Sequence, residues 1–284
     1  MSKVGIVIVN YNDFRKTWDF IDSIKDYRSL SEIVVVDNGS TDSSFKELKK
    51  LGKNNITVLR SNENKGYSFG NNIGIKYLSD KVDYILISNP DVVVEERIIK
   101  KLKEDLDNNP DVALVAPIVE QNGELLKGWR LPKVKDEIKL NLIKYYGSFE
   151  KPLRYDEKRY SDELTRVDAV LGCFFMIRRD VFNLVGNFDD SVFLFYEENI
   201  LATKLKRINK KSYIDNKTKI IHKGSTTINK HFTEIEKYKM LKDSQKYYVK
   251  YYLHANVFQI FVLRFIYRIT LIITYIVNFF KKKK

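Results

Sequence analysis

Short runs of consecutive apolar residues, separated by helix-like segments, are the feature that most restricts how this chain can fold. The runs VGIVIVN, EIVVVDN, ITVLRS and YILIS recur through residues 4–88. Runs that are apolar at consecutive positions are typical of central strands covered on both faces. Strands that alternate with helices along the chain predict an α/β fold with a doubly wound, mostly parallel sheet flanked by helices.

Polar residues follow three of these runs, at 10–12, 37–42 and 89–91. Ligands of open α/β sheets bind beyond the carboxyl ends of the parallel strands. We therefore expect a site at that edge of the sheet.

The length of 284 residues fits one large domain with an appendage. We expect a domain at 1–230, with halves at 1–110 and 111–230, and a helical tail at 231–284. The single cysteine, Cys173, excludes a disulfide framework and a Cys-rich zinc site, which favours a cytoplasmic location. The N-terminus has no secretory signal pattern.

Residues 132–166 are charged and rich in tyrosine, without a strand rhythm, and are expected to form an insertion or mobile cover that carries no chemistry. A strand, a turn and a helix beginning near Glu197 are predicted to follow.

The tail carries much of the net charge of +13, because no acidic residue follows Asp243. Residues 258–280 are long enough to span a bilayer but contain Arg264 and Arg268. At 100° per residue the polar and apolar side chains separate onto two faces, which predicts an amphipathic helix on an anionic membrane surface. A core helix packed on the domain is the alternative.

Asp37 ends a buried run, where its carboxylate can accept a hydrogen bond from a pyrimidine N3–H or a ribose hydroxyl. Tyr11 follows the first run and can stack on a base. Both have ordinary alternatives, because residues 39–42 suit a turn and a helix cap, and loop aromatics are common.

Residues 62–74 place three glycines around Asn71 and Asn72, which suits close approach of the backbone to a ligand. The segment does not match G-x-x-x-x-G-K-[ST], and no G-x-G-x-x-G follows the first run. ATP-binding P-loops and Rossmann dinucleotide sites therefore lose support.

Asp91 follows the run YILIS and is predicted to project beside Asp37, where a carboxylate can hold Mg²⁺ or Mn²⁺ against a diphosphate. His222 is a candidate for a further ligand. The alternatives are a turn before a helix for Asp91 and a strand-end residue for His222.

Glu197 and Glu198 open a predicted helix just after two aromatic residues. The helix N-terminus favours an ionised carboxylate, whereas aromatic neighbours raise its pKa. Acidic residues are also common in a first helical turn without any catalytic role.

Together these segments resemble the glycosyltransferases of family 2, which have the GT-A fold, and are most similar to the rhamnosyltransferase-like members. The resemblance spans residues 3–228. It rests on VNYN at 9–12, VVVDNGSTD at 34–42, NKGYSFGNNIG at 64–74, NPDVVV at 89–94, GCFFMIRRDVFNLVGNFDD at 172–190, FYEENIL at 195–201 and the histidine of HKGS at 222–225.

The resemblance implies a nucleotide-sugar-binding half at 1–110 and an acceptor half at 111–230. It assigns Tyr11, Asp37, Gly66, Asn71, Asn89 and Asp91 to the nucleotide sugar, Gly172 and Glu197 to the acceptor, Asp91 and His222 to Mg²⁺ or Mn²⁺, and Glu198 to the general base. The chain departs from the family pattern at Glu198, usually aspartate, at Ile200, often acidic, and at Asn89, which replaces the first carboxylate of a DxD motif.

The implied reaction is inverting transfer of a sugar, with rhamnose among the candidates, from a dTDP- or UDP-sugar to a hydroxyl of a lipid-linked or cell-surface glycan. The enzyme is expected to associate peripherally with the cytosolic face of the membrane. One rival is a nucleotidyltransferase, although no early Gly-rich, basic triphosphate loop is found. The other is a non-catalytic basic protein, for which the aliphatic residues in the tail favour lipid over nucleic acid.

Overall fold

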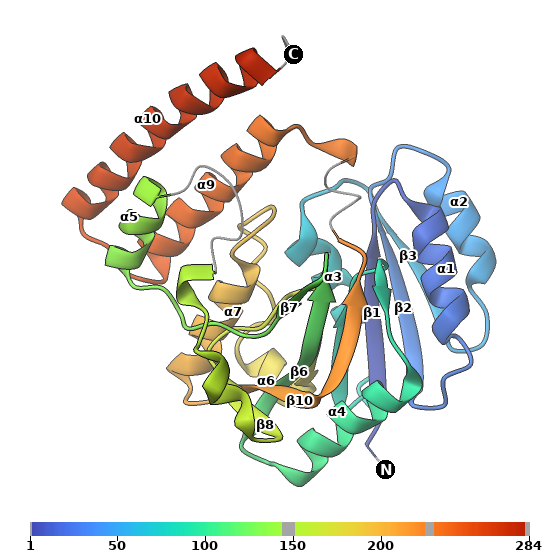
Figure 1. Cartoon of the computed structure of the whole chain (residues 1–284). Helices are drawn as coiled ribbons and strands as arrows, with labels where there is room; N and C mark the ends of the chain where they lie inside the picture. The colour runs from blue at the N-terminus through green and yellow to red at the C-terminus, as the bar shows by residue number, and fades with distance from the viewer. Residues whose placement is uncertain (1, 144–150, 225–229, 282–284) are drawn as a thin grey trace.

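The computed structural model describes residues 2–143, 151–224 and 230–281, which form one sheet with helices on both faces and a helical projection (Figure 1). The strands are β1 (Val4–Asn10), β2 (Leu30–Asn38), β3 (Ile56–Ser61), β4 (Tyr84–Ser88), β5 (Val92–Val93), β6 (Val112–Gln121), β7 (Glu124–Leu126), β8 (Leu164–Val167), β9 (Phe174–Arg178) and β10 (Lys211–His222). The helices are α1 (Phe14–Ile24), α2 (Ser44–Leu48), α3 (Tyr67–Tyr77), α4 (Glu96–Asn108), α5 (Val134–Ile143), α6 (Arg179–Leu184), α7 (Glu197–Arg207), α9 (Glu234–Tyr251) and α10 (Val257–Lys281).

The sheet has the strand order β3-β2-β1-β4-β9-β6-β10-β5. The first four strands pair in parallel, and β6 pairs in parallel with β10. Strand β9 is antiparallel to both β4 and β6, so the two parallel groups run in the same direction. The predicted mostly parallel α/β sheet is therefore confirmed, with β9 opposing its neighbours.

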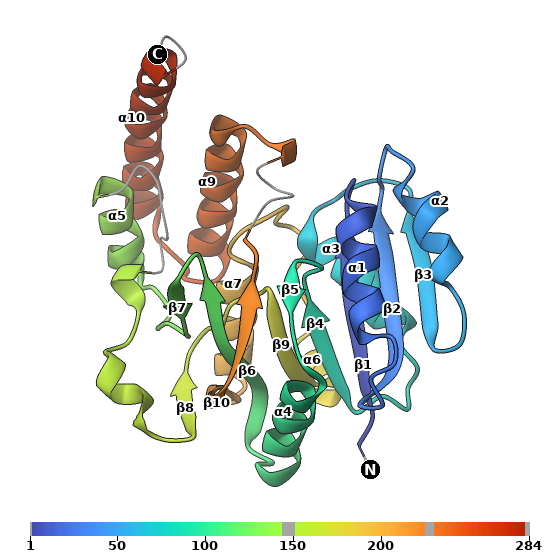
Figure 2. The same cartoon turned by 45° about the vertical axis from the view of Figure 1, so that its right-hand side comes forward.

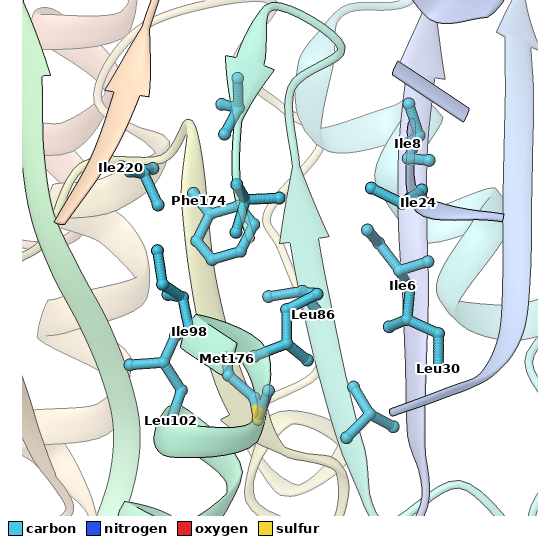
Figure 3. Packing of buried hydrophobic residues seen from close by; sticks show 14 of the residues in the cluster. Ile6, Ile8, Ile24, Leu30, Leu86, Ile98, Leu102, Phe174, Met176 and Ile220 are labelled. Atoms are coloured by element: carbon cyan, nitrogen blue, oxygen red, sulfur yellow. The ribbon is translucent and has the colours of Figure 1, made fainter. Parts of the chain in front are cut away.

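Alternating residues of the strands bury both faces of the sheet. Ile6 and Ile8 of β1 pack with Ile24 of α1, in a cluster that continues under α4 (Figure 3). Val7, between them, belongs to the cluster on the other face, which includes Ile75 of α3 and residues of α6 and α7. This two-sided burial is why the strand sequences are apolar at consecutive positions.

The described parts of the segment at 132–166, which are residues 132–143 and 151–166, have more regular structure than the sequence indicated, and residues 144–150 lie outside the described residues. The described parts contain α5, and β8 pairs antiparallel with β10. Val134 and Ile138 of α5 pack in a cluster with residues of α7, α9 and α10. The expected mobile cover is thus partly a structural support, and its apolar side was hard to recognise because it faces other helices rather than the sheet.

Helices α9 and α10 project beyond the edge toward which the parallel strands point (Figure 2). Leu263 and Ile266 of α10 are buried against the protein, while Phe261 and Phe265 are 63% and 57% exposed. The apolar side of α10 is therefore not a core face, which removes the alternative of a core helix. Within the described residues, α10 is the helix whose length and composition would suffice to cross a membrane.

Candidate active site

Parallel pairing in register brings the polar strand ends together. Asn10, the last residue of β1, pairs with Asp37 near the end of β2. Strand β9 runs the other way, so it begins at this edge, opposite the end of β4 at Ser88. Strand β10 ends there too, with His222 paired to Val92 of β5, next to Asp91.

A cavity at this edge, the donor cavity, is lined by Val9, Asn10, Tyr11, Asp13, Asn38, Asn64, Gly66, Tyr67, Asn89, Pro90, Asp91, Phe193, Leu194 and Phe232. Side-chain amides offer both donors and acceptors to a base and a ribose, and aromatic rings offer stacking surfaces. Four residues predicted to bind the nucleotide sugar line this cavity: Tyr11, Gly66, Asn89 and Asp91.

Asp37 lies directly behind the donor cavity. Its side chain is fully buried, and Oδ1 accepts a hydrogen bond from Asn10 Nδ2 at 2.9 Å. Its Oδ2 has no hydrogen-bond partner among the described residues and lies 3.9 Å from Arg60 Nε. Asp37 therefore fixes Asn10 and places a negative charge behind the cavity, rather than forming its lining.

Gly66 holds the predicted glycine-containing loop against the opposite wall. Its φ is +101°, and an added Cβ would lie 2.0 Å from the carbonyl oxygen of Phe193. The N–H of Tyr67 donates to that same oxygen at 2.9 Å. Asn71, also predicted here, is instead buried in α3, where its Nδ2 donates to the carbonyl of Tyr67 at 3.0 Å.

Asp91, His222 and Gln121 form a buried chain of contacts at the end of the sheet. His222 Nε2 lies 3.0 Å from Asp91 Oδ1, and His222 Nδ1 lies 2.8 Å from Gln121 Oε1. Because an amide oxygen only accepts, Nδ1 donates to Gln121 Oε1, which orients Nε2 toward the Asp91 carboxylate.

This pair fits a divalent cation. Its donor set, an imidazole nitrogen and a carboxylate oxygen 3.0 Å apart, consists of groups that Mn²⁺ and Mg²⁺ accept as ligands. The described residues contain no group of three His, Cys, Asp or Glu side chains that could hold an ion alone. A substrate diphosphate would therefore have to supply further ligands, as is common for Mg²⁺.

Glu197 and Glu198 begin α7, as predicted, but their environments differ. Glu197 is buried, and burial together with the neighbouring Glu198 carboxylate raises the pKa of Glu197 well above its usual range. Glu198 is less buried, and its Oε1 accepts a hydrogen bond from the N–H of Gly172 at 3.3 Å. The Tyr67 hydroxyl, which lines the donor cavity, donates to the carbonyl of Gly172 at 2.7 Å.

The backbone is strained just before these carboxylates. Phe195 and Tyr196 have φ values of +71° and +68°, in the left-handed region that large side chains rarely adopt. Tyr196 is held by its hydroxyl, which donates to Glu137 Oε2 of α5 at 2.7 Å, and Ser244 of α9 donates to the carbonyl of Leu194 at 2.8 Å. Contacts from helices α5 and α9 therefore fix the backbone just before α7.

Several contributors were not singled out from the sequence as site residues. Asn10 belonged to the polar cluster after the first run, so its position could have identified it. Tyr67 belonged to the segment NKGYSFGNNIG at 64–74, which could have identified it. Gln121 and Glu137 gave no comparable signal, because their roles depend on contacts between segments far apart in the chain.

Sequence comparisons show which known proteins the chain is similar to. A model of the family "Glycosyl transferase family 2" matches residues 5–186. The low-salt glycan biosynthesis hexosyltransferase Agl10 of Haloferax volcanii is 27% identical over 213 residues, which are 74% of this chain and 63% of that protein, so the chain spans less than two thirds of this relative. The N-acetylglucosaminyl-diphospho-decaprenol L-rhamnosyltransferase of Mycobacterium tuberculosis is 23% identical over 208 residues, 69% of this chain and 67% of that protein.

The fold is also shared with solved structures. A crystal structure of GalNAc-T7 with UDP, GalNAc and Mn²⁺ matches with a TM-score of 0.60 at 17% identity, over 79% of this chain and 44% of that one. At this identity the match concerns the fold alone. Because the family model covers more than half of the sequence, the chain belongs to glycosyltransferase family 2.

Proposed function

We propose that this glycosyltransferase moves a hexose or deoxyhexose, such as rhamnose, from a pyrimidine nucleoside-diphosphate sugar to a hydroxyl of a lipid-linked or cell-surface glycan. The observation that carries the proposal is the convergence of Asn10 with Asp37, Asp91 with His222, and Glu198 with Gly172 around one edge of the sheet. The hexosyl- and rhamnosyltransferase relatives support this class of sugar.

The donor side binds and orients the nucleotide. Tyr11 and the side-chain amides of the donor cavity hold the base and ribose, while Asp37 keeps Asn10 in place. Asp91 and His222 would hold a Mg²⁺ or Mn²⁺ ion, which would supply positive charge at the diphosphate. The GalNAc-T7 structure, which has a similar fold, contains UDP and Mn²⁺, and this supports a UDP-type donor and a divalent ion here.

The acceptor side removes a proton. Glu197 is buried, and burial together with the neighbouring Glu198 carboxylate raises its pKa, which favours the protonated form of its carboxyl over the ionised form that a base needs. Glu198 is the remaining carboxylate at the start of α7, and it takes the proton of the acceptor hydroxyl as that oxygen attacks the anomeric carbon. A single displacement of the nucleoside diphosphate inverts the configuration at that carbon.

The tail brings the enzyme to its acceptor. The exposed apolar face of α10 and the surrounding cations favour binding to the anionic cytosolic face of a membrane. The rhamnosyltransferase relative has a diphosphate-linked lipid in its name, which supports an acceptor of this kind.

The proposal is tested by incubating the protein with a panel of dTDP- and UDP-sugars and measuring the shift in its unfolding temperature. A donor that binds the folded chain raises this temperature by mass action. Turnover with the stabilising donor should release nucleoside diphosphate, and NMR of the product should show an inverted anomeric centre. Retention of configuration would contradict the single displacement, and absence of any donor-induced shift would contradict the assigned donor class.

A further inference from the structure

A second cavity of about 440 Å³ lies between the loop Ser191–Phe193, α9 and the start of α10, and we call it the basic cavity. Phe193 lines both the basic cavity and the donor cavity, so the two are adjacent. The loop is fixed on both sides: the carbonyl of Phe193 accepts from Tyr67 N–H, and that of Leu194 accepts from Ser244 of α9. A molecule in the basic cavity would therefore lie on the other side of this loop from the donor cavity.

The basic cavity has an excess of positive charge. Lys246, Lys250 and Arg264 line it together with one carboxylate, Asp243. No acidic side chain in the described ranges lies within ion-pairing distance of any of the three cations, whereas Lys237, on the same helix, pairs with Glu234. Cations that converge on one cavity without acidic partners favour an anionic ligand.

Apolar surface continues from this charged cavity along α10. Arg264 directly precedes the exposed Phe265 and follows the buried Leu263. With 100° between successive residues, Arg264 lies on the flank between the packed face and the exposed face. The exposed face carries Phe258, Phe261, Phe265, Ile269, Ile272 and Ile276. The basic cavity and the exposed apolar face of α10 are thus contiguous.

We propose that the basic cavity binds the diphosphate group of a lipid-linked sugar acceptor, whose hydrocarbon chain lies along the exposed face of α10. This inference rests on the proposed function, because it names the chemistry of the acceptor for the same site. The adjacency through Phe193 favours an acceptor over a bulk phospholipid. We expect a sugar attached to a diphosphate in this cavity to present a hydroxyl toward the donor cavity, whereas a phospholipid headgroup has no sugar hydroxyl to present there.

The test uses the full chain and farnesyl diphosphate as the probe, with UDP as the probe of the donor cavity. The cavity variant is Lys246→Glu with Arg264→Glu. The matched control is Lys239→Glu with Arg268→Glu, which makes the same charge change on the same two helices at positions outside the basic cavity. Circular dichroism and the unfolding temperature establish that both variants fold.

We expect the Kd for farnesyl diphosphate to rise at least tenfold in the cavity variant and less than twofold in the control, with the Kd for UDP unchanged in both. Farnesol should bind the native chain more weakly than farnesyl diphosphate does.

Equal losses of farnesyl diphosphate affinity in the two variants would assign binding to general surface charge and overturn the inference. UDP binding without farnesyl diphosphate binding would also overturn it while leaving the proposed function intact, whereas failure of UDP to bind would count against the proposed function itself. If the cavity variant does not fold, titration of the native chain with farnesyl diphosphate against farnesol and inorganic pyrophosphate decides, because a diphosphate site should bind the first and third.

Discussion

The two sides of the active site are held in place by different parts of the molecule. On the donor side, Asp37 and Asp91 each contact a side chain from another strand of the same sheet, Asn10 and His222 respectively. On the acceptor side, α7 begins after two residues in the left-handed region, and the contacts that hold this entrance come from α5 and α9, outside the sheet.

The geometry of the acceptor side therefore depends on helices outside the sheet, whereas the geometry of the donor side depends mainly on the sheet itself. Strand register fixes the donor side, so that side is preorganised before any ligand arrives. The acceptor side stores backbone strain, which persists only where surrounding contacts over-determine it. The same helices that supply those contacts carry the basic cavity and the exposed face of α10. Under the proposed function, acceptor binding and the positioning of the base would therefore both depend on one helical unit.

The largest expected effect is on the acceptor side, at Glu198. Glu198→Gln keeps an oxygen that can accept from Gly172 N–H but removes the proton acceptor, so turnover should fall by about a hundredfold or more. The Kd for the nucleotide sugar should change little, because the donor side is built separately. Turnover and donor affinity are measured in parallel.

Glu197→Gln is the matched control for that experiment. Burial and the neighbouring Glu198 carboxylate raise the pKa of Glu197 and favour its protonated form, so replacing its carboxyl by an amide should cost less than tenfold in turnover. If Glu197→Gln were the inactive variant and Glu198→Gln stayed active, the general base would be Glu197.

The donor side should respond next most strongly, through the metal. Asp91→Asn removes a charged ligand, so it should weaken Mn²⁺ binding and lower metal-dependent turnover by about a hundredfold.

Gln121→Leu removes only the acceptor that orients His222, and it should weaken Mn²⁺ binding by about tenfold to a hundredfold. Gln121→Glu, which keeps an acceptor, should recover most of the affinity. Mn²⁺ titration followed by electron paramagnetic resonance checks this, and an unchanged Kd in Asp91→Asn would remove Asp91 from the metal site.

The same contrast explains what the sequence could predict. The strands, their mostly parallel order and the gathering of Asp37 and Asp91 at one edge followed from local apolar runs and a rule about strand ends, and all are found in the fold. The place of His222 beside Asp91 was implied by the family resemblance. The order of motifs also identified the family, and family membership rules out the nucleotidyltransferase and non-catalytic alternatives.

Other features could not be predicted, for physical reasons. Asp37 lies behind Asn10 because the amide reaches it from a neighbouring strand, a side-chain detail that register alone does not fix. Asn71 turns into α3 rather than toward the donor cavity. Glu137 lies in a charged segment that suggests exposure, yet it is fully buried because α5 packs against α9 and α10, where Tyr196 and Gln245 donate to its carboxylate. Such contacts join distant segments and leave no local pattern.

A smaller effect is expected at the membrane-facing side of α10. Phe261→Glu with Phe265→Glu should lower binding to vesicles of anionic phospholipid by at least tenfold, because each buried phenylalanine contributes about 1.5–3 kcal/mol. The control is Tyr77→Glu with Leu184→Glu, two exposed residues on other helices. Cosedimentation measures binding, and added salt should weaken it in the native chain because the tail cations attract the lipid. Equal binding by both variants would show that α10 does not face the membrane.

The smallest expected effect on turnover is at Glu137, where the acceptor side can be tested through stability instead. Burial raises the pKa of Glu137 from its ordinary 4.5 to about 7, against the hydrogen bonds from Gln245 and Tyr196 and the charge of Lys242, which lower it. Between these pH values the folded chain holds a proton that the unfolded chain has released. Raising the pH therefore favours unfolding, and this contribution to stability is present below pH 4.5 and lost as pH rises through 7.

Lys242 has the opposite dependence, because burial lowers its pKa from 10.5 to about 8. Between those values the unfolded chain holds the extra proton, so stability rises with pH there. In Glu137→Gln the fall in the free energy of unfolding that Glu137 causes, up to about 1.4 kcal/mol per pH unit between pH 5 and pH 7, should disappear. Turnover at pH 8 should fall no more than a few-fold, because the amide oxygen still accepts from Tyr196. Urea unfolding of both proteins across pH 5–8 measures the difference. Parallel curves for the free energy of unfolding would mean that Glu137 titrates alike in the folded and unfolded chains. Curves that diverge together with a hundredfold loss of turnover would mean that the charge at Glu137, and not only the packing of α5 and α9, positions the start of α7.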